Sequence, residues 1–169
     1  MSTRNDFNML RCRDAESDSC DILRAGNLAR VAASDDMSEW SSSDVQQFAP
    51  LERRWTERAK FELTVPELIR RWERFVVKVE QGYASLIEEY QNDLDTRKLL
   101  QEAIEELRDG TAQRLSDMLR PWDRRFEAAT VPSDPPIWRG GWWAERMPKI
   151  LVGTLAEDVR RRGLRERTA

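Results

Sequence analysis

The chain has 169 residues, of which 40% are hydrophobic and 35% are charged, and its formal net charge is -3. This length suffices for one domain with a core, and the high charged fraction favours surface-rich helices over sheets. Histidine is absent, which excludes Ser-His-Asp and Cys-His catalytic sites and every metal site that needs a histidine ligand.

Cysteine usage and hydropathy indicate the compartment. Cys12 and Cys20 are too few for a four-cysteine zinc site and fit a reducing environment. No apolar run is long enough for a signal-peptide core or a membrane span, so we expect a cytoplasmic protein without a membrane partner. Only four of the 28 basic residues are lysine, an arginine bias that we interpret as a sign of a GC-rich bacterial genome.

Residues 1–50 are rich in Ser and Asp and contain few large apolar side chains. This composition is typical of a disordered arm. A natural start at Met37 would explain it equally well, because residues 1–36 would then not belong to the native protein. Helical spacing of Phe48, Leu51 and Trp55 also allows a short helix near residues 45–60. We place a single helical domain at residues 51–165.

The strongest helical pattern begins at Leu63. Thr64 is expected to cap a helix, with Glu67 completing a capping box and Pro66 in the tolerant first turn. Apolar residues then recur every three or four positions, which predicts one long amphipathic helix through residue 94. Its apolar positions are Leu68, Trp72, Phe75, Val76, Val79, Tyr83, Leu86, Ile87, Tyr90 and Leu94. Gly82 interrupts the helix propensity, so we expect a kink or a close contact there.

Two shorter helices are expected next. The turn-forming residues NDLDT (92–96) precede a predicted helix over 96–108, which Gly110 should stop. Thr111 is expected to cap the other, and Pro121 should kink or restart it.

A Trp-rich irregular loop separates these helices from a last helix expected over 149–162. No period-2 alternation and no hairpin turn predicts a strand. The predicted fold class is therefore all-α, a small helical bundle with a long first helix and a disordered N-terminal arm.

The loop PPIWRGGWWAERMP (135–148) holds Trp138, Trp142 and Trp143 within six residues. Adjacent helical positions point about 100° apart, so Trp142 and Trp143 must face different environments. Three interpretations stay open: a lid over the core, an exposed contact for a partner, or part of a small-ligand pocket.

Charge is distributed unevenly along the chain. Residues 80–106 carry eight carboxylates against Arg97 and Lys98, whereas residues 51–78 carry an excess of basic side chains. The carboxylates form either a solvated helix face or an acidic surface that recognises a basic partner. The candidate partner-binding residues are Glu88, Glu89, Asp93, Glu102, Glu105, Trp138, Trp142 and Trp143.

The carboxylates also supply the one catalytic alternative. Glu89 with Asp93, and Glu102 with Glu105, have the helical spacing by which all-helical nucleotide hydrolases hold Mg²⁺. No phosphate-binding glycine loop accompanies them, so we assign no catalytic residue and no cofactor.

A polar and aromatic cluster is expected near the junction of the first two helices. Its members are Tyr83, Tyr90, Asn92, Asp93 and Arg97. We interpret it as structural, with Arg97 pairing with Asp93 four residues earlier.

The C-terminal run RRRGLRER supplies a second alternative, contact with nucleic acid. The low net charge argues against autonomous binding of this kind. The leading hypothesis is a non-catalytic bacterial interaction protein, either an adaptor or a stoichiometric, immunity-type inhibitor of a basic protein partner. The alternatives are an Mg²⁺-dependent nucleotide hydrolase and a nucleic-acid-associated regulator.

Overall fold

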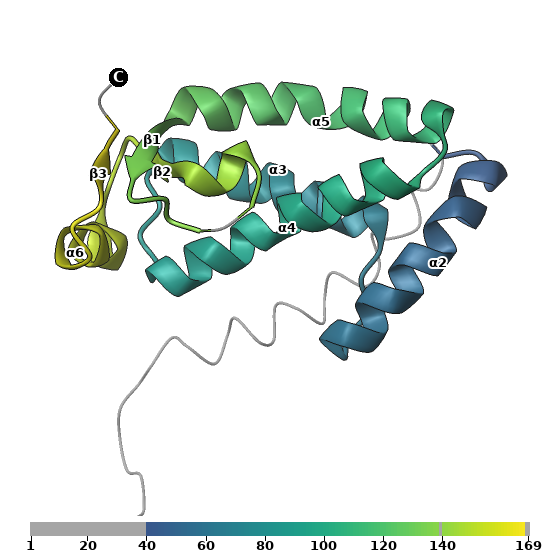
Figure 1. The fold of residues 1–169 in the computed structure, drawn as a ribbon, viewed down its shortest axis with the longest axis horizontal. Coiled ribbons are helices and arrows are strands. Elements are labelled where there is room, and N and C mark those ends of the chain that lie inside the picture. The colour runs from purple at the N-terminus through teal and green to yellow at the C-terminus, as the bar shows by residue number, and fades with distance from the viewer. Residues whose placement is uncertain (1–39, 139, 168–169) are drawn as a thin grey trace, which may run out of the picture. The chain divides into compact units, whose positions relative to one another are not determined.

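The computed structural model describes residues 40–138 and 140–167. The N-terminal arm expected before Trp40, and the natural start at Met37, lie outside these residues. Three helices pack side by side: α3 (Val65–Gln81), α4 (Ile87–Glu106) and α5 (Asp109–Ala129). As Figure 1 shows, α2 (Ser42–Ala59) lies at one end of this layer, and a small sheet and α6 (Gly153–Arg161) lie at the other. The predicted helical bundle is confirmed.

α2 begins earlier than we expected. The hydroxyl of Ser41 accepts the backbone N–H of Asp44, and the Asp44 carboxylate accepts the backbone N–H of Ser41, which is a complete capping box. Residues 42–50, which we assigned to the arm, therefore form the first half of a helix. The buried residues Phe48, Leu51 and Trp55 hold it against the bundle.

The expected long first helix is two helices. Thr64 does cap α3, accepting the Glu67 backbone N–H at 3.3 Å, but the Glu67 carboxylate binds Arg70, Arg71 and Arg74 and so does not complete the capping box. α3 ends at Gly82, whose φ is 100°. A Cβ there would lie 3.1 Å from Cγ2 of Ile150, so Gly82 does make a close contact, but with a residue outside the helices, and the helix ends there instead of kinking.

The turn expected over 92–96 lies inside α4, and the helix expected over 96–108 is the second half of α4. Asn, Asp and Thr form turns when their side chains bond to the nearby backbone. Asp93 instead accepts the hydroxyl of Tyr83 at 2.8 Å. Leu94, in the middle of the expected turn, and Leu100, after it, are both buried and keep the helix continuous.

α5 runs through Pro121 without restarting. It leads directly into a three-stranded antiparallel sheet that no alternation predicted. The strands are β1 (Thr130–Asp134), β2 (Arg146–Pro148) and β3 (Arg165–Glu166), in the order β2-β1-β3. Val131 pairs with Met147, and Ser133 pairs with Glu166. Strands of two to five residues are too short to produce a periodic signal.

α6 is shorter than the helix expected over 149–162. Residues 146–148 pair with β1 as β2, and α6 starts only at Gly153, whose φ is 53°. A Cβ on Gly153 would lie 2.8 Å from the backbone oxygen of Ala84, so this close approach requires glycine.

The core is rich in aromatic side chains. Four of the seven tryptophans are buried: Trp40, Trp55, Trp72 and Trp143. Phe75 lies at the centre, with its ring 5.5 Å from that of Trp72, 5.3 Å from that of Tyr90 and 5.7 Å from that of Phe126. Among the described helices, none has an apolar stretch of the length needed to cross a bilayer.

Candidate functional site

The Trp-rich loop presents its three indoles in two directions. Trp143 is buried at 5% exposure, whereas Trp138 and Trp142 are 42% and 40% exposed. Trp142 and Trp143 are the first two residues of the 3₁₀ helix η4 (Trp142–Glu145), and the planes of their rings are 84° apart. The expected divergence of Trp142 and Trp143 is present, and one loop combines a core lid with exposed aromatic side chains. Trp143 is buried in the core, so we leave it out of the partner surface proposed below.

Local contacts hold the loop in place. A Cβ on Gly141 would come within 2.3 Å of the Trp143 ring, so glycine is required for this indole to fold inward. The Trp138 backbone N–H donates to the Ala144 carbonyl at 3.0 Å, and the side chain of Gln91 donates to the Ile137 carbonyl at 2.9 Å. The indole Nε1–H of Trp138 donates to Asp95 on α4 at 3.3 Å. The exposed indoles are thus fixed relative to α4.

Beneath the loop lies an interior ion pair. Arg97, which is 5% exposed, donates from Nε and Nη2 to the two carboxylate oxygens of Asp123 at 3.0 and 2.9 Å. The indole N–H of Trp72 donates to the same carboxylate at 3.0 Å, and the Arg97 guanidinium carbon lies 4.7 Å from the centroid of the Trp143 ring. Arg97 therefore does not pair with Asp93; its partner comes from α5, 26 residues later.

Asp93 lies with the two tyrosines that the sequence grouped with it. Its carboxylate accepts the Tyr83 hydroxyl, and the rings of Tyr83 and Tyr90 are 5.2 Å apart. Burial raises the pKa of Asp93, although the Tyr83 hydrogen bond opposes this rise. The Tyr90 hydroxyl donates to the carbonyl of Arg146 at 3.1 Å. These three polar groups have partners within the fold, whereas Arg97 and Asn92, which the sequence grouped with them, do not join this cluster: Arg97 binds Asp123 and Asn92 is exposed.

The α4 carboxylates divide into two groups. Three are in ion pairs: Glu88 with Arg162, Glu102 with Arg58, and Glu106 with Arg54. Four have no cationic partner among the described residues: Glu89, Asp93, Asp95 and Glu105. Glu105 accepts a hydrogen bond from the side chain of Gln101 at 3.0 Å.

The geometry separates the proposed metal ligands. Glu89 and Glu102 lie 13 positions apart on the continuous helix α4, a rise of about 20 Å. The two carboxylate pairs therefore cannot share one ion. Within residues 40–138 and 140–167, no three side chains of metal-ligating type converge.

The C-terminal arginines are engaged within the fold. Each donates to a nearby carbonyl or carboxylate. The partners are the Ala156 carbonyl for Arg160, Asp158 for Arg161, Glu88 for Arg162, Asp134 for Arg165 and Glu145 for Arg167. Nucleic-acid phosphates would have to compete with these contacts.

A groove of about 450 Å³ opens between the C-terminal part of α2, the linker that follows it, α3 and α4. Its apolar lining includes the buried residues Trp55, Leu63 and Leu68, and Phe61, which is 52% exposed. The guanidinium carbon of Arg71 lies 5.7 Å from the centroid of the Phe61 ring. Sequence reasoning missed this groove because its walls come from four separate segments.

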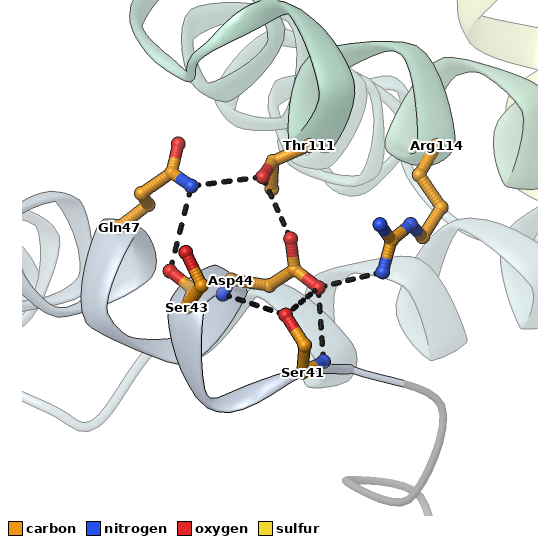
Figure 2. A network of polar contacts seen from close by, with 6 residues as sticks. All are labelled: Ser41, Ser43, Asp44, Gln47, Thr111 and Arg114. Atoms are coloured by element: carbon orange, nitrogen blue, oxygen red, sulfur yellow. Dashed lines mark hydrogen bonds and ion pairs between the residues drawn. The ribbon is translucent and has the colours of Figure 1, made fainter.

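Sequence reasoning also missed the network around Asp44, which Figure 2 shows. Asp44 is 2% exposed and accepts the hydroxyls of Ser41 at 2.7 Å and Thr111 at 2.6 Å and the guanidinium of Arg114 at 2.7 Å. Gln47 adds two links to α5, donating to the Thr111 hydroxyl and accepting the Arg108 backbone N–H. The serine followed three residues later by an aspartate was a helix-start signal that could have located this network.

Comparisons with models of known protein families, with curated proteins and with solved structures find no match to this chain.

Proposed function

We propose that the protein is a non-catalytic cytosolic interaction protein, an adaptor or a stoichiometric, immunity-type inhibitor. It binds a protein partner through the Trp-rich loop (residues 135–148, the Trp loop below) and the adjacent acidic face of α4. The single observation that carries this proposal is the pair of exposed indoles, Trp138 and Trp142, on a loop that Trp143 anchors in the core.

Exposed tryptophans on a fixed loop have the properties of binding hot spots. Tryptophan is enriched among the residues that dominate interface energetics. An aromatic side chain that is already held in position loses little further conformational freedom on binding. Trp142 rests against Phe126, with ring centroids 6.1 Å apart, and Trp138 is hydrogen-bonded to Asp95. Both indoles are thus ordered before any partner arrives.

The charge of α4 supports a basic partner. Glu89 and Glu105 are exposed and have no cationic partner in the described part of the chain. Asp95, beside Trp138, has none there either. Unpaired carboxylates on α4, of which Asp95 lies beside Trp138, favour association with a positively charged surface and raise the rate of encounter. We therefore expect binding that weakens as ionic strength rises.

The catalytic and nucleic-acid alternatives receive less support. The nearest members of the two carboxylate pairs, Asp93 and Glu102, lie about 14 Å apart along one helix, and the C-terminal arginines already bond to carboxylates and a carbonyl.

The test is co-purification of the tagged full chain from a lysate of its source organism. The matched variants are the Trp138→Ala/Trp142→Ala double variant and Ile150→Ala. Ile150 is 51% exposed and lies over Gly82, outside the loop. We expect a stoichiometric companion to co-purify with wild type and with Ile150→Ala, and salt should release it. The double variant should fold cooperatively but should not retain the companion. A companion that the folded double variant retains would contradict the proposal.

A further inference from the structure

The groove between α2 and α4 has polar groups without partners. The indole Nε1–H of Trp55 is buried and has no acceptor among the described residues. In the same part of the chain, the Asn92 amide, the Thr96 hydroxyl and the Lys98 ammonium also have no hydrogen-bond or ion-pair partner. All four residues line the groove.

These groups have one chemical property in common. Indole N–H and ammonium only donate hydrogen bonds, and amide and hydroxyl can both donate and accept. Lys98 also brings a positive charge. A buried polar donor normally has an acceptor, and the buried Trp55 indole N–H has none among the described residues, whereas Asn92 and Lys98 are exposed to solvent.

The acidic residues of the groove do not supply that acceptor. Asp95 accepts the indole N–H of Trp138 at 3.3 Å, and Glu102 lies 3.7 Å from the guanidinium of Arg58. The Arg71 guanidinium, in turn, is 3.1 Å from Glu67. These pairings leave Lys98 as the cation of the groove without a carboxylate partner among the described residues.

The remaining lining favours a flat apolar body. Trp55, Leu63 and Leu68 form the apolar floor of the groove, although each is no more than 5% exposed, and Phe61, at 52% exposure, adds a ring at the edge. A volume of about 450 Å³ lies in the range of small-molecule sites, which combine apolar walls with a few placed polar groups.

We propose that this groove binds a small organic acid, with its carboxylate toward Lys98 and Thr96 and its flat apolar body against Trp55 and Leu68. An acceptor on the same ligand satisfies the Trp55 indole N–H. The site is distinct from the partner surface proposed above, and its occupancy does not depend on that proposal. Among the described residues, it is linked to the Trp loop through Asp95, which lines the groove and accepts the indole N–H of Trp138.

The test uses two probes with the same body, 2-naphthoate and the neutral 2-naphthamide, titrated into the ¹⁵N-labelled full chain. The indole N–H signal of Trp55 is identified as the one missing from the spectrum of Trp55→Phe. We expect a saturable shift of this signal with naphthoate and about tenfold weaker binding of the amide, because only the acid forms a charge-assisted hydrogen bond.

Matched lysine variants separate a specific site from general attraction. Lys98→Gln should remove the preference for the acid, whereas Lys78→Gln, an exposed position on α3 outside the groove, should keep it. The proposal is overturned if neither probe shifts the Trp55 signal at millimolar concentration, which would mean that water occupies the groove. Equal binding of the two probes, or an unchanged preference in Lys98→Gln, would also overturn it.

Discussion

The two ends of α2 differ in how completely their buried polar groups are hydrogen-bonded. At its N-terminal end, the buried Asp44 carboxylate receives hydrogen bonds from Ser41, Thr111 and Arg114 (Figure 2). At its C-terminal end, Trp55 and the facing α4 residues Asn92, Thr96 and Lys98 present donors that lack acceptors in the described part of the chain. One end is a buried acceptor with its donors, and the other holds a buried donor, the Trp55 indole N–H, without an acceptor among the described residues.

This contrast distinguishes a structural contact from a site with unused binding capacity. A buried donor left without an acceptor costs about 1–3 kcal/mol, whereas a satisfied hydrogen bond contributes about 1 kcal/mol to stability. The N-terminal network therefore stabilises the packing of α2 on α5. While the groove is empty, the unpaired Trp55 N–H costs stability and the exposed Asn92 and Lys98 side chains contribute little. The groove donors should add to stability only when a ligand is present.

The largest expected effect comes from removing the acceptor of the N-terminal network. Asp44→Ala leaves the Ser41 backbone N–H and the Thr111 hydroxyl without their shared partner. We expect a loss of about 2–3 kcal/mol in the free energy of unfolding, measured by urea denaturation. Ser43→Ala is the control, because this exposed residue contributes only its backbone carbonyl to the network. Equal stability of the two variants would contradict the assigned role of Asp44.

The pH dependence of stability should reveal the same carboxylate. Hydrogen bonds from Thr111 and Ser41 lower the pKa of Asp44 in the folded state below its unfolded value of about 3.9. Its stabilising contribution is therefore complete above the unfolded pKa and is lost as pH falls through the folded pKa. Glu67 and Glu80, whose pKa values are also lowered, contribute in the same direction. Asp44→Asn should lose less stability than wild type on acidification, and parallel curves would contradict this.

The donor side of the network gives a smaller effect. Thr111 is 5% exposed; its hydroxyl donates to Asp44 at 2.6 Å and accepts from Gln47 at 2.9 Å. Thr111→Val keeps the shape of the side chain and removes both hydrogen bonds. We expect a loss of about 1–2 kcal/mol by the same denaturation measurement. A double variant with Asp44→Ala should lose less than the sum of the two single effects, because both changes break one contact.

Sequence periodicity predicted which segments are helical, but it could not locate where the first of them breaks. Leu68 to Leu94 keep a helical phase, and the chain breaks within it because Gly82 takes a positive φ and Ile150 packs against it. That contact joins positions far apart in the sequence. The short strands also depend on contacts between distant positions, because Val131 belongs to a strand only by pairing with Met147.

The candidate site was predictable only in part. Helix geometry required Trp142 and Trp143 to diverge, but the sequence could not show which one faces inward. The inward position of Trp143 depends on Arg97 and on the absence of a side chain at Gly141. Arg97 itself has a local candidate partner in Asp93, and it binds Asp123 instead because α5 brings that carboxylate to it. The groove donors could not be grouped at all, since Trp55 comes from α2 and Thr96 from α4.

The smallest expected effect is the sharpest test of the contrast. Thr96→Val makes the same chemical change as Thr111→Val at a position of similar burial, 8% exposed against 5%. Because the Thr96 hydroxyl has no partner in the described part of the chain, its removal should change the free energy of unfolding by less than about 0.5 kcal/mol. The same variant should weaken the binding of 2-naphthoate. If Thr96→Val destabilises the protein as much as Thr111→Val does, the Thr96 hydroxyl has a structural partner. The groove would then not differ from the Asp44 network in having unused donors.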